Sequence, residues 1–133
     1  LVRIGGKDVE GAIVVSGPAV VAEQLPDTHP SKAAAVDFVT NYEKAYGAGS
    51  RSQFAGHAYD ARIMLEKILP VALKKAKPGT PEFRAALRDA VEGMGRTIFA
   101  HGVMNWTATD HWGYTNETGV LLKVVDGKFV VEK

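Results

Sequence analysis

The sequence contains no cysteine, so disulfide bonds and thiolate metal sites are excluded. It also has almost no excess charge, because 16 basic residues are balanced by 15 acidic ones and the net charge is +1. Proteins that bind nucleic acid normally carry a basic patch, and we therefore expect no nucleic-acid partner. No apolar run approaches the roughly 20 residues that cross a bilayer. The 133 residues, 46% of them hydrophobic, have the length and apolar content of one ordinary domain.

Three main helices are predicted in the middle of the chain. The first follows an apolar stripe within residues 28–46 and stops at a glycine. The second opens at Ala58, and Pro70 marks a boundary or kink near Leu69, because proline lacks the N–H of the helical hydrogen bond. The third lies within residues 80–92, where a threonine supplies the N-cap and a proline occupies the first turn.

Strands are predicted towards both ends. The β-branched run at residues 9–16 is typical of a buried strand, covered on both faces in a parallel sheet. A short strand over 103–107 leads into a polar loop, and the chain closes with a β-hairpin whose tight turn is Asp126-Gly127. This turn pairs residue 124 with 129 and residue 122 with 131. Four side chains then share the face assigned to the core: Leu122, Val124, Phe129 and Val131.

The candidate binding residues are Phe54, Gly56 and His57. They stand just before the second helix, where small polar residues predict a loop, and loops that lead into rigid elements often carry function. A glycine between two ring side chains would let a ligand approach the backbone closely. The alternative is structural: Phe54 packs against the start of the helix, and His57 is an ordinary surface or core histidine.

Catalytic and metal sites are not expected. No pair among the four histidines has the spacing of a zinc site, so we predict no metal and no cofactor. Asp110-His111, and Asp60 near His57, suggest a hydrolase as a third option, with Ser50 or Ser52 as the nucleophile. However, nothing resembles a nucleophile elbow, and we predict that the protein is not an enzyme.

Six short segments, in this order, resemble the C-terminal part of the periplasmic leucine/branched-chain amino-acid binding-protein family of ABC transporters. They are Val9-Glu10-Gly11, Tyr46-Gly47, Ala58-Tyr59-Asp60-Ala61, Leu87-Arg88-Asp89-Ala90, Asp110-His111-Trp112-Gly113 and Asp126-Gly127-Lys128-Phe129. No single segment is specific, but the set covers essentially the whole chain.

The resemblance implies an α/β protein, specifically a partial two-lobed type I periplasmic binding-protein fold. Such a chain would have three main helices, a buried strand and a C-terminal β-hairpin. Residues 1–18 would form a second-lobe strand and crossover, residues 28–96 the helices, and residues 102–133 a short strand, a loop and the terminal hairpin. The chain would then be the C-terminal segment of a longer solute-binding protein, with Phe54, Gly56 and His57 facing the interlobe cleft.

Members of this family are periplasmic or otherwise extracytoplasmic. The resemblance therefore implies capture of a small amino acid or of an aromatic or aliphatic carboxylate, and its delivery to the membrane permease of an ABC importer. The alternative is a ligand-sensing regulatory domain of the same fold. Because a segment cut from a larger protein exposes strand edges and apolar helix faces, we also expect the chain to self-associate.

Overall fold

The computed structural model describes residues 1–132. Eleven elements follow one another along them: α1 (Val2–Gly5), the 3-10 helix η1 (Gly6–Val9), β1 (Ile13–Ser16), the 3-10 helix η2 (Pro18–Gln24), α2 (Lys32–Tyr46), α3 (Gln53–Leu73), α4 (Pro81–Glu92), β2 (Thr97–Phe99), β3 (Gly102–Met104), β4 (Val120–Val125) and β5 (Lys128–Val131). The predicted α/β class is confirmed.

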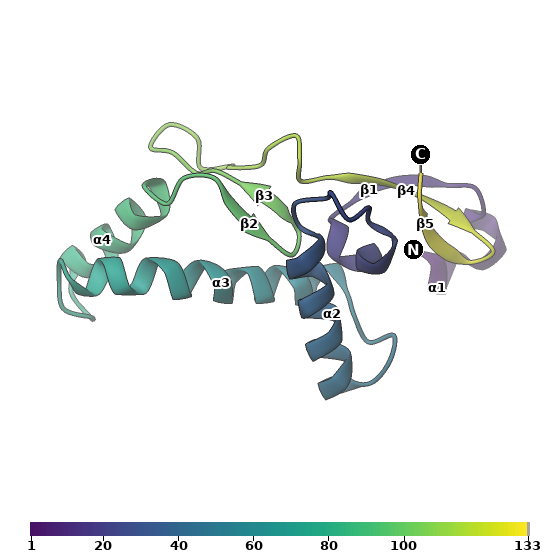
Figure 1. The fold of residues 1–133 in the computed structure, drawn as a ribbon, viewed down its shortest axis with the longest axis horizontal. Coiled ribbons are helices and arrows are strands. Elements are labelled where there is room, and N and C mark those ends of the chain that lie inside the picture. Colours follow the sequence, from purple (N-terminus) through teal and green to yellow (C-terminus); the bar gives the residue numbers. More distant parts are fainter. Residues whose placement is uncertain (133) are drawn as a thin grey trace.

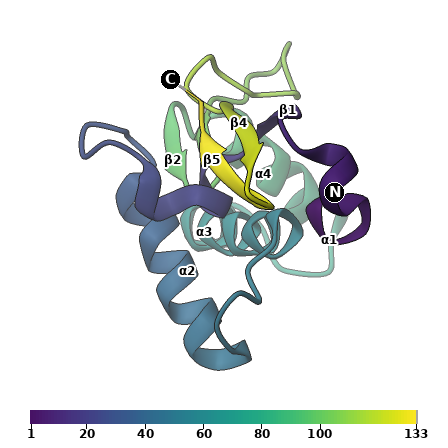
Figure 2. The ribbon, with the colours of Figure 1, turned by 90° about the vertical axis from the view of Figure 1, so that its right-hand side faces the viewer.

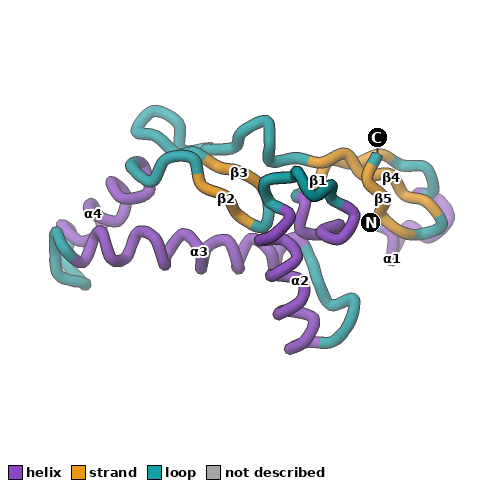
Figure 3. The backbone as a smooth tube through the Cα atoms, viewed as in Figure 1, coloured by secondary structure: helices purple, strands orange, loops and turns teal. Residues whose placement is uncertain are grey.

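The long helix α3 runs along the longest dimension of the molecule (Figure 1). The β2–β3 hairpin lies on one side of it, while α2 projects from its N-terminal end towards the other side (Figure 3). α4 packs against α3 at its far end. A three-stranded sheet in the order β1-β4-β5 occupies the opposite end of the molecule, where both chain termini lie (Figures 1 and 2).

The main core sits where η2, α2 and β4 meet the turn between β2 and β3. Its buried members are Ala19, Val21, Ala22, Leu25, Ala35, Phe38, Val39, Ala100 and Leu122. A smaller cluster of Ala72, Phe83 and Ala86 joins the end of α3 to α4. The central part of α3 lies between these two clusters and buries few side chains, and Leu65 there is exposed.

The C-terminal hairpin has the predicted register. Val124 pairs with Phe129 and Leu122 with Val131 across the Asp126-Gly127 turn. Both turn residues have positive φ angles, 50° for Asp126 and 69° for Gly127, as a tight two-residue turn requires. Of the four side chains predicted to face the core, Leu122 and Val124 are buried. The other two, Phe129 and Val131, are partly buried and pack against the main core.

The prediction that residues 9–16 form a strand covered on both faces in a parallel sheet is wrong. β1 spans only Ile13–Ser16, lies at the edge of the sheet and pairs antiparallel with β4. Val15 is 70% exposed, so the strand is not covered on both faces. A short β-branched run fits an edge strand as well as a buried one, and periodicity cannot separate the two. The assignment of residues 1–18 to a second lobe stays a prediction, as does self-association.

The helices are placed well except for α3. It begins at Gln53, not at Ala58, because the Ser52 hydroxyl accepts a hydrogen bond from the Ala55 N–H and caps the helix. It also continues through Pro70 to Leu73, where packing against α4 outweighs the missing hydrogen bond. Sequence patterns gave no signal for α1, η1 or β2. Within residues 1–132, no helix is both long and apolar enough to span a membrane.

The linker between α2 and α3 is held by charge despite its glycines. Arg51 donates hydrogen bonds to Glu43 of α2 at 2.6 Å and to Glu23 of η2 at 2.6 and 2.7 Å. Burial of this guanidinium is incomplete, so the pairs are partly screened. These pairs tie the residue before the Ser52 cap to both α2 and η2.

Two adjacent leucines of β4 provide a direct test of the core. Leu122 is 0% exposed and Leu121 is 52% exposed. We expect Leu122→Ala to lower the free energy of unfolding by about 2–5 kcal/mol, because the removed methyl groups leave a cavity. The matched variant Leu121→Ala should change it by less than about 1 kcal/mol. Chemical denaturation measures both, and equal losses would show that the core is misplaced.

Candidate functional site

A hollow opens where the end of β1, the start of α3 and the loop before β4 come together. Its volume is about 280 Å³, near the lower limit for small-molecule sites. We call it the polar hollow, and it is lined by Val15, Ser16, Gly17, Gln53, His57, His101, Tyr114, Thr115, Thr118 and Gly119. Hydroxyl, amide and imidazole groups therefore converge on one concave surface.

A second, more apolar hollow of about 190 Å³ lies next to it and shares two of its residues, His57 and Tyr114. We call it the aromatic hollow, and it is lined by His57, Asp60, Ala61, Met64, Phe99, Met104, Trp106 and Tyr114. The Phe99 and Trp106 rings meet edge to face, with centroids 5.7 Å apart. The pair of hollows thus offers polar groups on one side and aromatic surface on the other.

His101 forms the wall between the polar hollow and the interior. The side chain is 1% exposed, and its ring fills the space between two glycines. A Cβ atom on Gly17 would lie 2.1 Å from its Cδ2, and a Cβ atom on Gly56 would lie 1.9 Å from its Cε1. Both glycines are therefore required sterically, since any side chain there would displace the imidazole.

Asp60 holds the backbone from which His101 projects. One carboxylate oxygen accepts the Ala100 N–H at 2.7 Å, and the other accepts the His101 N–H at 3.0 Å. These two residues form the turn between β2 and β3, so the carboxylate anchors that hairpin to α3. Burial raises the pKa of Asp60 to about 6, because it outweighs the stabilisation of the anion by the two N–H groups.

The two histidine rings are stacked. The ring centroids of His57 and His101 are 4.3 Å apart and the rings are tilted by 31°. Burial, and secondarily the nearby His57, lower the pKa of His101 to about 4. At neutral pH, His101 is therefore an uncharged imidazole beside an ionised Asp60.

The structure places the three predicted binding residues differently from one another. They lie in the first turns of α3, not in a loop, because the Ser52 cap extends the helix over them. His57 lines both hollows. Gly56 is buried, and the group that approaches its backbone is the imidazole of His101. Phe54 is 85% exposed and lines neither hollow. Contact of these residues with a ligand stays a prediction.

Sequence reasoning missed His101 and Tyr114 as parts of the site, and it considered Asp60 beside His57 only for a hydrolase. Asp60 stands three residues after His57, so the two side chains share one face of a helix that begins early enough to include both. His101 gave no local signal, since its place depends on the unpredicted hairpin of β2 and β3.

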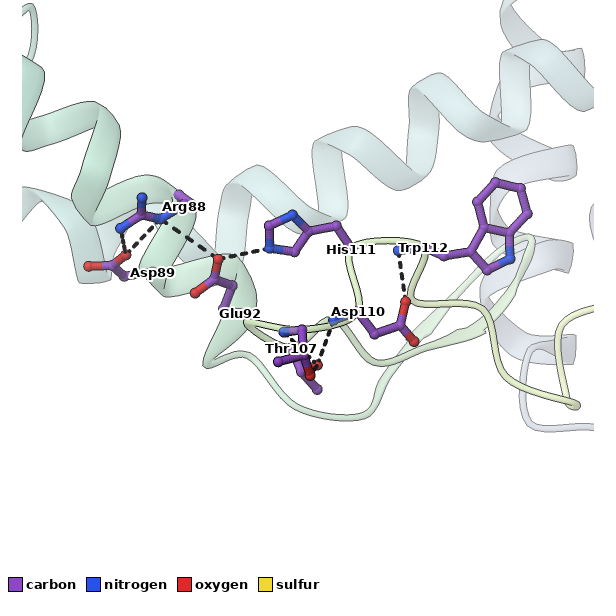
Figure 4. Close-up of polar contacts among 8 residues, drawn as sticks. Arg88, Asp89, Glu92, Thr107, Asp110, His111 and Trp112 are labelled. Atoms are coloured by element: carbon purple, nitrogen blue, oxygen red, sulfur yellow. Dashed lines mark hydrogen bonds and ion pairs between the residues drawn. The ribbon is translucent and has the colours of Figure 1, made fainter.

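Side-chain hydrogen bonds hold the polar loop before β4 in a defined conformation. One Asp110 oxygen accepts the backbone N–H groups of Trp112 and Gly113 at 2.9 and 3.2 Å, and His111 Nε2 lies 2.9 Å from a Glu92 oxygen of α4. Figure 4 shows these groups linking the loop to α4. The Trp112 and Tyr114 rings lie next to each other, with their centroids 5.0 Å apart. Tyr114 itself forms an antiparallel bridge with Met104, and this bridge, together with the Asp110 turn just before it, places Tyr114 at the edge of both hollows.

Several solved structures have a similar fold. The chain is similar to an extracellular ligand-binding receptor from Rhodopseudomonas palustris, with 48% identity and a TM-score of 0.92. A second such receptor, from strain HaA2, has 44% identity and a TM-score of 0.92, and a third from the same strain has 38% and 0.86. The match covers 99% of this chain and 37% of the first two receptors, and 98% of this chain and 36% of the third.

The fold therefore matches part of an extracellular ligand-binding receptor fold. The predicted resemblance to the C-terminal part of a periplasmic solute-binding protein is confirmed. The chain spans a little over one third of the length of the receptors it matches. No family model and no curated protein matches the sequence.

Gly56 provides a test of the His101 wall. Replacing a glycine by alanine inside a helix normally adds up to about 1 kcal/mol of stability. Here we expect Gly56→Ala to lower the free energy of unfolding by about 1–3 kcal/mol, because the new methyl group overlaps the imidazole. In a double-mutant cycle, the same change made in a His101→Ala background should cost much less. Additive effects in chemical denaturation would contradict the contact.

The pKa values of Asp60 and His101 predict opposing effects of pH on stability. Between pH 3.8 and about 6, the folded state keeps a proton on Asp60 that the unfolded chain has released, so this contribution to stability is lost as the pH rises. Between pH 6.5 and about 4, the unfolded chain protonates His101 before the folded state does, so that contribution is lost as the pH falls.

The two contributions nearly cancel in the native protein, and Asp60→Asn should reveal the second. Acidification from pH 6.5 to 4 should then destabilise the variant more than the native protein, by an additional amount of roughly 3 kcal/mol. Urea denaturation in buffer with a chelator, at several pH values, measures the difference. Parallel pH profiles for the two proteins would contradict the assigned protonation states.

Proposed function

We propose that this chain is part of the extracytoplasmic solute-binding component of an ABC importer, which captures a small amino acid or an aromatic or aliphatic carboxylate and has no catalytic step. The observation that carries the proposal is the pair of hollows that meet at His57. The similarity to receptors described as extracellular and ligand-binding supports both the role and the extracytoplasmic location.

The chemistry of the hollows suits a solute with a polar end and a flat or apolar body. Ser16, Gln53 and Thr115 offer hydrogen-bonding groups on the polar side, and Trp106 offers a ring face on the other. An aromatic ring of this size favours contact with any flat hydrophobic group, because the two bury a large apolar area against each other. No arginine or lysine lines either hollow in the described part of the chain, so a carboxylate bound here would rely on neutral donors such as Gln53 and Thr115.

Capture would work by a population shift. In a two-lobed protein, solute contacts from both lobes favour the closed form, and the permease would recognise that form. The hollows described here would supply one wall of the cleft. A ligand-sensing domain would use the same closure to control a different partner. A binding experiment therefore tests the ligand capture that both functions require, and a transport assay distinguishes solute uptake from sensing.

Ligand binding can be tested by thermal denaturation of the natural full-length protein with a panel of amino acids and of aromatic and aliphatic acids. A true ligand raises stability by mass action, by about 2.7 kcal/mol at 100 times its Kd. We expect at least one member to do so, and we expect His57→Ala to weaken its binding by about tenfold or more. The matched control His111→Ala alters an exposed histidine that lines neither hollow and should bind normally.

Two results would contradict the proposal at different levels. If no compound in the panel raises the melting temperature, this solute class is wrong. If a ligand binds equally well to the native protein and to His57→Ala, the hollows are not its site. Phe54→Ala tests separately whether the exposed ring of α3 takes part.

A further inference from the structure

Three side chains that commonly bind metals converge where the polar hollow meets the aromatic hollow. His57 and Asp60 share one face of α3, and His101 reaches them from the turn between β2 and β3. One potential ligand atom from each lies within 4.8 Å of the other two. Two imidazoles and a carboxylate form a ligand set suited to divalent first-row transition metals such as zinc and iron.

Two members of this cluster are buried: among the described residues, His101 has no hydrogen-bond partner for its ring, and Asp60 has no basic side chain within ion-pair distance except His101. Neither ring nitrogen of His101 has a hydrogen-bond partner among residues 1–132. The Asp60 side chain belongs to a residue that is only 6% exposed, and in the described part of the chain no lysine or arginine pairs with it. Its nearest basic atom is His101 Nδ1, 3.6 Å from Oδ2. A buried carboxylate and a buried unpaired imidazole are both costly, and one cation would satisfy both.

We propose that His57, Asp60 and His101 bind a divalent transition-metal ion, for which Zn²⁺ is the best-matched probe. Bonds from zinc to nitrogen and oxygen are about 2.0–2.2 Å long, so two ligand atoms of one ion lie at most about 4.4 Å apart. The 3.6 Å between His101 Nδ1 and Asp60 Oδ2 already meets this limit. The larger separations require a small inward movement, for which the half-buried His57 ring has room.

The surroundings already orient two of the three ligands. The N–H groups of Ala100 and His101 hold the Asp60 carboxylate, and each of its oxygens keeps a further lone pair for a metal. Gly17 and Gly56 fix the plane of the His101 ring. Such support usually accompanies real metal ligands and raises their affinity. Because both histidines line the polar hollow, an ion bound here would lie at its wall.

The competing explanation is a latch without metal, in which Asp60 and His101 only fasten the β2–β3 turn to α3. The two explanations differ over His57. A latch does not need its ring nitrogens, whereas a three-ligand site loses a donor when they are removed. Substitution by phenylalanine keeps a ring against His101 and removes only the nitrogens, so it separates the two.

The test is calorimetric titration of the chelator-treated, dialysed protein with Zn²⁺ alone, in the absence of any solute. We expect one ion per chain, and His57→Phe should weaken binding by about tenfold or more. The same substitution at the exposed His111, His111→Phe, is the matched control and should leave the affinity unchanged. Co²⁺ in place of Zn²⁺ should give visible absorption bands that His57→Phe abolishes. Circular dichroism checks that the variants are folded, and His57→Gln serves as a second variant if His57→Phe is not.

The possible results distinguish a metal site from a metal-free latch. Absence of stoichiometric Zn²⁺ binding, or equal affinity in His57→Phe and the native protein, would leave a latch only and overturn the proposal. Loss of binding in His111→Phe would show that zinc binds at the surface and would overturn it as well. Because no solute is present, none of these results bears on whether the protein captures a carboxylate.

Discussion

The bond network of Asp60 is the constraint on which the site depends. Its carboxylate joins α3 to the turn between β2 and β3 through two backbone N–H groups, and no other side-chain hydrogen bond among the described residues joins these two elements. The turn carries His101, whose ring closes the space between Gly17 and Gly56. Three segments distant in sequence, the end of β1, the start of α3 and the β2–β3 turn, are thereby brought to one point. Both hollows border on that point, so their shape follows from one buried carboxylate.

The same device occurs at the other hairpin of the molecule. The Glu10 carboxylate accepts the N–H groups of Asp126 and Gly127, the two residues of the β4–β5 turn, at 2.8 and 3.2 Å. There the acid is exposed to water, and the bonds serve only to fasten the N-terminal segment to the hairpin. At the β2–β3 turn the acid is buried, and its charge is taken out of water beside a neutral imidazole. The hydrogen bonding is alike in the two places, and it is the burial that makes the Asp60 cluster chemically distinctive.

Local signals predicted those parts of the fold that local chemistry decides. The Asp126-Gly127 turn determined the register of the last hairpin, and Thr80-Pro81 located the start of α4, where the threonine hydroxyl accepts the Phe83 N–H. The predictions were wrong where distant contacts decide. Burial of β1 depends on which elements cover it, and the survival of α3 beyond Pro70 depends on packing against α4. The site was located only in part for the same reason: His57 could be singled out from its neighbours, whereas the place of His101 depends on a hairpin that no pattern revealed.

Gly56 has a different structural role from the one that its sequence neighbours suggested. Sequence alone suggested that a glycine between aromatic residues would leave space for a ligand. In the structure that space is taken by the ring of His101, which Gly56 and Gly17 together allow to lie flat against the backbone. The two glycines consequently determine how far the imidazole stands out into the polar hollow. The depth of the hollow is thus decided by residues that contribute no side chain to it, and the polarity of its floor by an imidazole that burial keeps uncharged.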